Sequence, residues 1–350
     1  MTVDWDEDER RTQFFNSFIT QHIGSKEFSS LQSLIFDSCH SGRPGNPPST
    51  MNTPMLSNLT FHAEIFTIPR LSPENIVNLD YTCLFMTPPE VLDLLSAFPA
   101  LEQCSITDTE PEGYAEDRVD HAVVSLNHLR SLSIKSRWFE DVDYLLDHMD
   151  IPATATTIIG LLGVGDDEDD ATFESLIGSR LRLYDGLKLV QSPHSLVATL
   201  TPKFGGSLQF SYEGDLWRTL KDMSLSSFSA YSSILSSIDL EIPSLSSAVE
   251  LVEALRPSPL IHIRVRTQEA SFERLLTALE DTPGVVCPFL ESIDCTGTPF
   301  SAARMRNFLN FREAKAIPLR ELKITKGLCD PDTHGFLSIV DRLIEVDARS

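Results

Sequence analysis

The sequence predicts an α/β solenoid, with a curved parallel sheet on its concave side and helices outside. Two observations predict this fold class. An apolar phrase, leucine-x-x-leucine-x-aliphatic, recurs along the chain with the alternation typical of half-buried strands. An amphipathic helical pattern follows several copies of the phrase. Residues 126–152, LNHLRSLSIKSRWFEDVDYLLDHMDIP, contain one complete strand and helix unit.

The first 27 residues are expected to form an amphipathic helix that caps the solenoid. An acidic run, Asp4 to Glu9, comes first, and Phe14, Phe15 and Phe18 then follow at helical spacing. A solenoid needs a polar outer face at its ends, which such a helix would supply. The predicted repeat domain covers residues 28–346.

The strand phrase opens five units in the first part of this domain. Its first positions are Leu31, Leu56, Ile76, Leu101 and Leu129, which lie 25, 20, 25 and 28 residues apart. Leucine-rich repeats are about 20 to 29 residues long. The first copy, LQSLIFDSC, also places Cys39 where their consensus has asparagine or cysteine. The predicted fold is therefore a leucine-rich-repeat-like solenoid.

One helix and two loops are predicted between these strands. A helix begins at Pro88 and ends before Pro99, and its apolar face consists of Val91, Leu92, Leu95 and Phe98. Residues 41–54 are rich in Gly, Pro, Ser and Asn, and residues 108–120 are acidic and rich in turn formers. Both segments are expected to be exposed.

The repeat cannot be followed through residues 153–228, where we expect an irregular insertion. A strand is predicted at 156–162, followed by the acidic run DDEDD at 166–170 and a short helix at 173–181. Alternating apolar residues then predict strands at 187–189, 196–200 and 208–212, the last two joined through Gly205 and Gly206. A hairpin insertion explains this pattern with fewer assumptions than a second domain.

The unit returns four times after the insertion. Strand phrases begin at Leu235, Leu260, Leu290 and Leu319, at steps of 25, 30 and 29 residues. A helix is predicted after each strand, and Ser271 is expected to be the N-cap of the second. The apolar residues of these four helices are Leu245, Val249, Val252 and Leu255; Phe272, Leu275, Leu276 and Leu279; Met305, Phe308 and Leu309; and Phe336, Ile339, Val340 and Leu343.

This unit, with the phrase HLRSLSIKSRWFEDVDYLLDHMDIP at its centre, resembles the leucine-rich-repeat region of fungal F-box-like proteins. The resemblance covers roughly residues 28–346. It implies a substrate-binding repeat region of a ubiquitin ligase, which an F-box joins to the adaptor subunit of a cullin ligase. Residues 1–27 contain one helical pattern and lack the Leu-Pro-x-Glu phrase with which such boxes begin. The chain thus resembles the repeat region without an evident F-box.

Composition excludes several classes of partner. The net charge of −23 and the pI near 4.7 argue against binding of nucleic acid or anionic lipid. The sequence contains no run of about 18 apolar residues, so no membrane span is predicted. The N-terminus is acidic where a secretory signal would be basic. We expect an intracellular protein, cytoplasmic or nuclear, with free, buried cysteines, because the six cysteines form no C-x-x-C pair.

Motifs for chemistry are absent from the sequence. Residues Asp330, Asp332 and His334 are the nearest approach to a metal-binding cluster, and GLLGVG at 160–165 lacks the order of a dinucleotide loop. The sequence contains no G-x-S-x-G elbow. We therefore expect a binding protein that has no catalytic residue, cofactor or metal. An enzyme on another α/β fold is the alternative.

Register predicts where a partner would bind. Side chains between the buried positions of each strand line the concave face of a solenoid, where such proteins usually bind. In the unit at 126–152 these are Ser131, Ser133 and Lys135. Later strands contribute His262, Arg264 and Arg266, and then Lys323, which form a local basic cluster in an acidic chain.

The basic cluster predicts a protein partner that offers an acidic or phosphorylated peptide. The alternative is that these cations are ordinary solvated strand residues, paired with nearby carboxylates such as Glu269 and Asp294. At the level of the whole protein, the alternative to a ligase substrate receptor is a stand-alone repeat scaffold that has no role in ubiquitination.

Overall fold

A computed structural model describes most of the chain. It divides into two compact units, residues 1–162 and residues 163–350, which we call unit 1 and unit 2. The boundary falls inside the predicted insertion. The structure describes residues 27–38, 53–63, 73–83, 87–108, 121–136, 139–162, 184–192, 195–203, 205–213, 234–244, 248–256, 258–281, 286–328 and 333–347.

Unit 1 is organised around a parallel sheet in which neighbouring strands follow one another in the sequence. Its strands are β1 (Ser33–Ser38), β2 (Asn58–Ala63), β3 (Asn78–Cys83), β4 (Gln103–Asp108), β6 (Ser131–Ser136) and β8 (Thr156–Leu162), in that spatial order. Each pairs with the next in parallel. The five predicted strand phrases are therefore confirmed, and so is the strand at 156–162.

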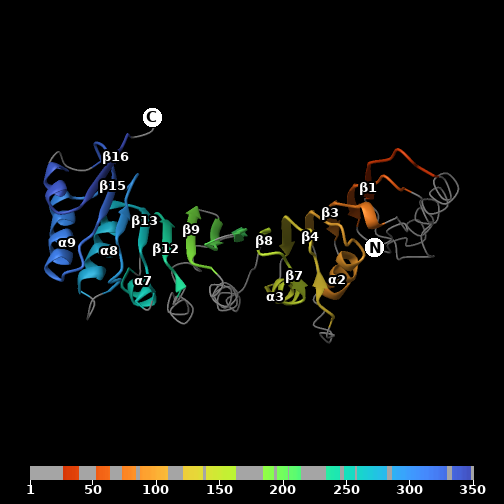
Figure 1. Cartoon of the computed structure of the whole chain (residues 1–350), viewed down its shortest axis with the longest axis horizontal. Helices are drawn as coiled ribbons and strands as arrows, with labels where there is room; N and C mark the ends of the chain where they lie inside the picture. Colours follow the sequence, from red (N-terminus) through yellow and green to blue (C-terminus); the bar gives the residue numbers. More distant parts are fainter. Residues whose placement is uncertain are drawn as a thin grey trace, which may run out of the picture. The chain divides into compact units, whose positions relative to one another are not determined.

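Two helices follow strands of unit 1, as predicted. They are α2 (Pro88–Ser96) and α3 (Phe139–Asp147), which contact each other (Figure 1). The α2 residues Val91, Leu92 and Leu95 are buried, as is Phe98 just beyond its end. A short 3-10 helix, η2 (Pro73–Asn75), and a two-stranded sheet of β5 (Val124–Ser125) and β7 (Met149–Asp150) complete the unit. Met149 lies in β7, because α3 ends at Asp147.

Unit 2 begins with an antiparallel meander. Strands β9 (Gly186–Ser192), β10 (Ser195–Thr201) and β11 (Leu208–Glu213) pair with β10 in the centre. The predicted hairpin pattern is confirmed, including the strand pair β10 and β11 around Gly205 and Gly206. Strand β9 also pairs in parallel with β12 (Ser237–Glu241), so the meander is continuous with the parallel strands that follow.

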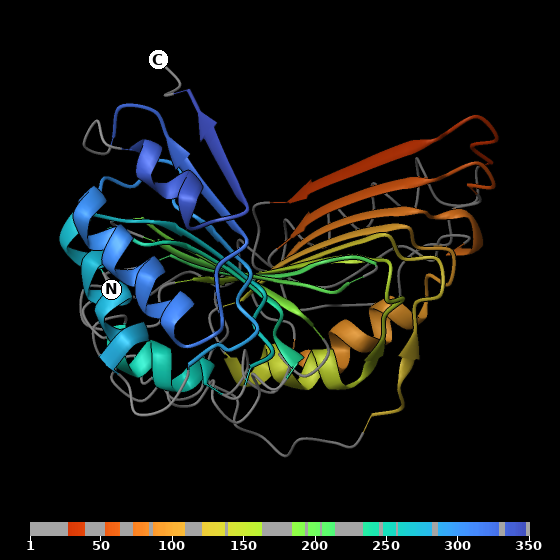
Figure 2. The same cartoon turned by 60° about the vertical axis from the view of Figure 1, so that its left-hand side comes forward.

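The rest of unit 2 alternates strands and helices. Parallel strands β12, β13 (His262–Arg266), β14 (Ser292–Asp294), β15 (Glu321–Thr325) and β16 (Arg342–Val346) lie side by side in sequence order. The helices α7 (Ala248–Leu255), α8 (Glu269–Asp281) and α9 (Ala302–Ala314) pack against one another on one side of these strands (Figure 2). Both units are thus α/β structures dominated by a mostly parallel sheet with few helices.

The buried core of unit 2 lies between the strands and these helices. Alternate strand residues such as Ile263, Val265 and Leu322 are buried, together with Phe272 and Phe308 of the helices. Complete burial of an aliphatic or aromatic side chain stabilises a fold by about 1.5–3 kcal/mol. The strand residues between the buried ones therefore point to the face opposite the helices.

The predicted last helix is wrong. Residues 333–338 form a 3-10 helix, η4 (Thr333–Ser338), which buries Phe336, and Leu343 lies in strand β16. The apolar spacing of this segment favours a helix, but all five residues of β16 find register partners on β15. Pairing with an existing sheet edge overrides the local helical pattern.

Two details of the predicted helices are also wrong. Val249 is 60 % exposed, because the buried face of α7 is formed by Ala248, Leu251, Val252 and Leu255. Ser271 is buried inside α8, which begins at Glu269; the N–H groups of Ser271 and Phe272 donate to the carbonyl oxygen of Gln268.

Several predictions lie outside the described residues. These are the cap helix over residues 1–26, most of the loops at 41–54 and 108–120, the acidic run at 166–170 and the helix at 173–181. Within the described part of the chain, no helix combines the length and the apolar character needed to cross a membrane.

Candidate functional site

The candidate site lies on the sheet face of unit 2 opposite helices α7, α8 and α9. Strand β13 sets the orientation: Ile263 and Val265 are buried, so His262, Arg264 and Arg266 point to the other face. The same alternation applies to β15, where Leu322 and Ile324 are buried and Lys323 lies between them. All four predicted basic residues therefore emerge on one face.

Five charged residues form a row across five adjacent strands on this face. Register pairs Lys188 with Asp239, Asp239 with Arg264, Arg264 with Asp294, and Asp294 with Lys323. Because the strands are in register, positive and negative side chains alternate from β9 to β15. We call these five residues the charge ladder. Opposite charges on neighbouring strands stabilise a sheet, typically by about 0.2–1 kcal/mol per pair.

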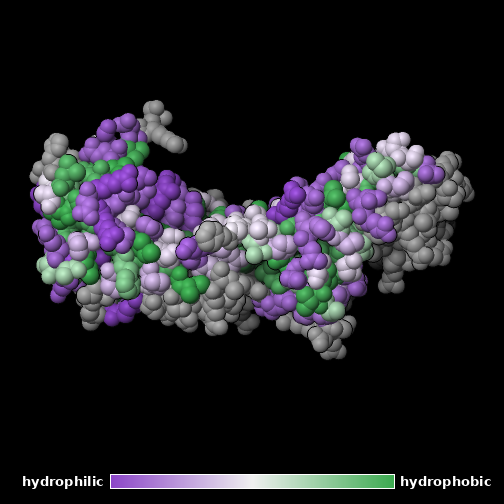
Figure 3. Space-filling view, viewed as in Figure 1, coloured by the Kyte–Doolittle hydropathy of each residue, from purple (hydrophilic) through white to green (hydrophobic). Residues whose placement is uncertain are grey.

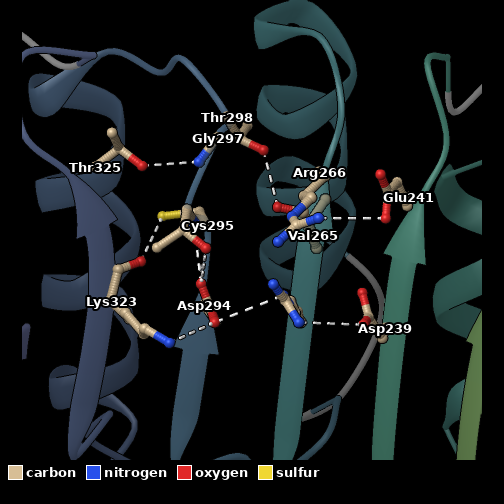
Figure 4. A network of polar contacts seen from close by, with 12 residues as sticks. Asp239, Glu241, Val265, Arg266, Asp294, Cys295, Gly297, Thr298, Lys323 and Thr325 are labelled. Atoms are coloured by element: carbon tan, nitrogen blue, oxygen red, sulfur yellow. Dashed lines mark hydrogen bonds and ion pairs between the residues drawn. The ribbon is translucent and has the colours of Figure 1, made fainter. Parts of the chain in front are cut away.

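The contacts within the ladder differ in closeness. Lys323 Nζ lies 3.2 Å from Asp294 Oδ2. Arg264 is more loosely held, with Nη1 3.5 Å from Asp239 Oδ2 and Nε 3.7 Å from Asp294 Oδ2. Lys188 Nζ is 3.9 Å from Asp239 Oδ2. Since charge-assisted hydrogen bonds are about 2.7–2.9 Å long, Arg264 and Lys188 keep much of their capacity to bind another anion. Figure 4 shows Lys323, Asp294 and Asp239 in this row.

The cations of the ladder are more exposed than its carboxylates. The side chains of Lys188, Arg264 and Lys323 are 43 %, 36 % and 35 % exposed, whereas those of Asp239 and Asp294 are 20 % and 17 % exposed. Three cations also face two carboxylates. A partner that approaches this row therefore meets ammonium and guanidinium groups first.

Asp294 is the centre of the network. Burial raises its pKa, but hydrogen bonds from the Thr296 hydroxyl and N–H and from Lys323 outweigh burial, so the pKa of Asp294 is lowered. The Thr296 hydroxyl donates to Asp294 Oδ1 over 2.6 Å and the Thr296 N–H over 3.0 Å. The Oδ2 atom is left for Arg264 and Lys323. Asp294 is thus held ionised and anchors two of the three cations.

A hollow of about 390 Å³ lies along the ladder. Two residues before the ladder on each strand, register aligns a second row, Gly186, Ser237, His262, Ser292 and Glu321. The hollow is lined by the five ladder residues and by Ser237, His262, Ser292 and Glu321 of this second row. All of its lining residues belong to unit 2.

The ends of the strands beside the ladder are fixed by side-chain to backbone hydrogen bonds. The Thr298 hydroxyl donates to the Val265 carbonyl oxygen over 2.8 Å, and the Thr325 hydroxyl accepts from the Gly297 N–H over 2.8 Å. The Cys295 thiol donates to the Lys323 carbonyl oxygen over 3.3 Å (Figure 4). Each bond joins one repeat to a neighbour, so the spacing of the ladder is held by the turns that follow the strands.

The predicted site residues fall into three groups. His262, Arg264 and Lys323 line the hollow. Arg266 lies on the same face one step further along β13, where its Nη1 is 3.4 Å from Glu241 Oε2. Ser131, Ser133 and Lys135 belong to β6 in unit 1, where they alternate with buried Leu132 and Ile134 as predicted.

Sequence reasoning missed Lys188 and Asp239 of the ladder, and Glu241 beside it. Asp239 and Glu241 alternate with Ile238 and Leu240, so the register rule applied to β13 would have found them on β12. Lys188 was harder to find, because it belongs to the meander. The alternative interpretation, that these cations pair with nearby carboxylates, is confirmed for Asp294. Asp239 and Glu241, rather than Glu269, pair with Arg264 and Arg266.

The described residues also contain cysteines and possible metal ligands. Cys104, Cys287 and Cys295 are buried thiols that form no disulfide bond. Burial raises the pKa of Cys104 to about 12 and that of Cys287 to about 11, so neither is a thiolate near neutral pH. No group of three or more His, Cys, Asp or Glu side chains suited to a metal ion occurs within the described ranges.

Comparison with known proteins assigns no family. No protein-family model matches the chain, and no curated protein matches it significantly. The site is therefore interpreted from its own geometry. In the space-filling view, hydrophilic side chains gather over the strands of unit 2 (Figure 3), in keeping with a polar binding surface rather than an apolar one.

Proposed function

We propose that this chain is a protein-binding module whose charge ladder binds an acidic segment of a partner protein. The observation that carries the proposal is the arrangement of the ladder: three half-buried cations, each more exposed than the two carboxylates between them, border a hollow of about 390 Å³. Carboxylates of a partner could approach these cations without first meeting Asp239 or Asp294.

The internal ion pairs do not prevent such binding. The ladder contacts of Lys188 and Arg264 are 3.5 Å or longer, so a partner carboxylate can compete for these cations at closer range. Arg264 is the best placed, because its contacts with Asp239 and Asp294 are both longer than a charge-assisted hydrogen bond. Its guanidinium can bind a carboxylate through two parallel N–H groups.

The strong negative charge of the whole protein favours a short acidic segment over a long polyanion. At physiological ionic strength charges are screened beyond about 8 Å, so a few carboxylates in the hollow respond mainly to the ladder. A nucleic acid would extend past the ladder onto a chain whose net charge is −23. A phosphorylated segment is the competing ligand that the experiment below separates from an acidic one.

The alternation of strands and helices supports a further part of the proposal, that the chain is a leucine-rich-repeat-like solenoid with a curved sheet. Consecutive units contribute one strand each, in parallel and in register, as solenoid repeats do. The resemblance to repeat regions of fungal F-box-like proteins would make the acidic segment part of a ligase substrate. A stand-alone scaffold is the alternative, and capture of a cullin with its adaptor from cells distinguishes the two.

The binding proposal is tested with a fluorescein-labelled peptide of nine glutamates. The triple variant K188E, R264E, K323E reverses the ladder cations and is expected to weaken binding at least tenfold, because each reversal turns an attraction into a repulsion. The measurement is fluorescence anisotropy at about 0.15 M salt. A serine peptide carrying three phosphates is titrated in parallel.

The control variant R130E, R274E, K326E makes the same change in charge at exposed cations outside the ladder. It should bind the glutamate peptide within about twofold of the unmodified protein, since screening limits the effect of distant charges. Equal losses in both variants, or binding of the phosphorylated peptide alone, would contradict the proposal. Circular dichroism verifies that each variant is folded.

A further inference from the structure

The cations of the charge ladder are separated by a fixed distance. Lys188, Arg264 and Lys323 lie on alternate strands, β9, β13 and β15, with Asp239 and Asp294 on the strands between Lys188 and Arg264 and between Arg264 and Lys323. Neighbouring strands lie about 4.8 Å apart, so successive cations of the ladder emerge about 9.6 Å apart. The row runs across the strands rather than along them.

We infer that the ladder binds a segment in the polyproline II conformation that carries an acidic residue at every third position and runs across strands β9 to β15. This inference rests on the proposed function and specifies the conformation and sequence period of its ligand. A polyproline II helix has three residues per turn and rises about 3.1 Å per residue, so every third side chain shares one face at a spacing of about 9.3 Å. That period matches the spacing of the three cations.

Other regular conformations fit the spacing less well. In an extended strand, side chains on one face repeat at about 6.7 Å, and a carboxylate after the first would fall near Asp239 rather than a cation. In an α-helix, one turn advances about 5.4 Å, which is shorter than the spacing between successive cations, and two turns advance about 10.8 Å, which is longer. Only a three-residue period places acidic groups at Lys188, Arg264 and Lys323 while leaving Asp239 and Asp294 unopposed.

The floor of the hollow suits a polyproline II backbone. This conformation has no internal hydrogen bonds, so its carbonyl groups need donors from water or from the partner. Ser237, His262 and Ser292 line the hollow, and within the described part of the chain their side chains make no hydrogen bond. The hydroxyl and imidazole groups are therefore available to the backbone of the bound segment.

The experiment compares three labelled peptides that contain the same three glutamates and six prolines. The first is (Glu-Pro-Pro)₃, with the predicted period. The second has the three glutamates adjacent, and the third has one glutamate at each end and one beside the first. The periodic peptide is expected to bind at least fivefold more tightly than either rearranged peptide.

A coupling test locates the middle contact. Replacing the central glutamate of the peptide by glutamine should weaken binding, and so should the protein variant R264Q. When both changes are made, the fold-loss of affinity should be clearly smaller than the product of the two single fold-losses, because the two groups contact each other. The control R274Q removes an exposed cation of α8. When it is combined with the peptide change, the loss of affinity should equal the product of the two single fold-losses.

The outcomes separate the two proposals. Tighter binding of the periodic peptide, coupled to Arg264, supports the inference. Equal binding of all three peptides, abolished by K188E, R264E, K323E, overturns the three-residue period but keeps the acidic ligand. Failure of these peptides and of the nine-glutamate peptide to bind overturns the proposed function itself.

Discussion

Asp294 holds the charge ladder together by accepting hydrogen bonds from Thr296 and by pairing with Lys323 and Arg264. Its pKa in the folded protein is lowered, because these donors outweigh the effect of burial. A carboxyl group of this kind stabilises the fold above its ordinary pKa, and the contribution is lost as pH falls through the lowered value. The charge of Asp294 should therefore matter at pH 7 and cease to matter in strong acid.

We predict that D294N lowers the free energy of unfolding by about 1 kcal/mol at pH 7, because Lys323 and Arg264 lose their shared anion. The difference from the unmodified protein should shrink as pH falls below about 4, the ordinary range of an aspartate. Urea unfolding at pH 7 and at pH 2.5 measures both values. If D294N lowers the free energy of unfolding equally at both pH values, the charge of Asp294 does not contribute to stability.

At the residue scale, the sequence predicted which face the basic strand residues occupy, but of their carboxylate partners it predicted only Asp294. Register followed from alternation, so His262, Arg264, Arg266 and Lys323 were correctly assigned to one face. Their carboxylate partners depend on which strands become neighbours. Asp239 is a partner of Lys188 because β9 of the meander pairs with β12. No local sequence pattern predicts that pairing.

At the level of elements, Arg312 shows how a helix fixes the loop before the next strand. It is 1 % exposed on the inner face of α9, where its Nη2 donates to the carbonyl oxygens of Leu290 and Cys287 over 3.1 and 3.3 Å. Cys287 has a φ of +48°, a left-handed conformation that costs energy for a residue with a side chain. Arg312 therefore anchors a strained turn that leads into β14.

We predict that R312A destabilises the protein by about 2–4 kcal/mol, because it leaves a cavity and deprives two buried carbonyl groups of a donor. The comparison is R320A, which removes an arginine whose side chain is 67 % exposed and which should cost at most about 1 kcal/mol. Thermal unfolding of both variants is the measurement. Similar unfolding midpoints for the two would contradict the anchoring role.

Elements that contain a repeated strand phrase could be predicted from the sequence. Elements that depend on pairing with a neighbouring strand, or on which face of a helix is buried, could not. The leucine phrases predicted strands β1 to β4, β6 and β12 to β15, because alternation reports burial directly. Strand β16 was missed because its apolar spacing also suits a helix, and only the free edge of β15 decides between them. Arg312 was missed because a charged residue on the buried face of α9 reverses the usual expectation.

At the scale of the whole molecule, the chain combines a net charge of −23 with a local surface on which three cations are more exposed than the carboxylates beside them. The amino-acid composition correctly predicted an acidic protein but could not locate the exception, which is the cationic charge ladder. The exception arises because strands from distant parts of unit 2, residues 186–325, are brought into register across one face. We propose that this face is the binding surface.

The most direct test of this account is a map of backbone amide chemical shifts in the full chain as (Glu-Pro-Pro)₃ is added. We expect the changes to centre on β9, β12, β13, β14 and β15, around Lys188, Arg264 and Lys323, and to leave the outer surfaces of α7 and α8 unchanged. Changes confined to the helices or to unit 1 would contradict the central claim.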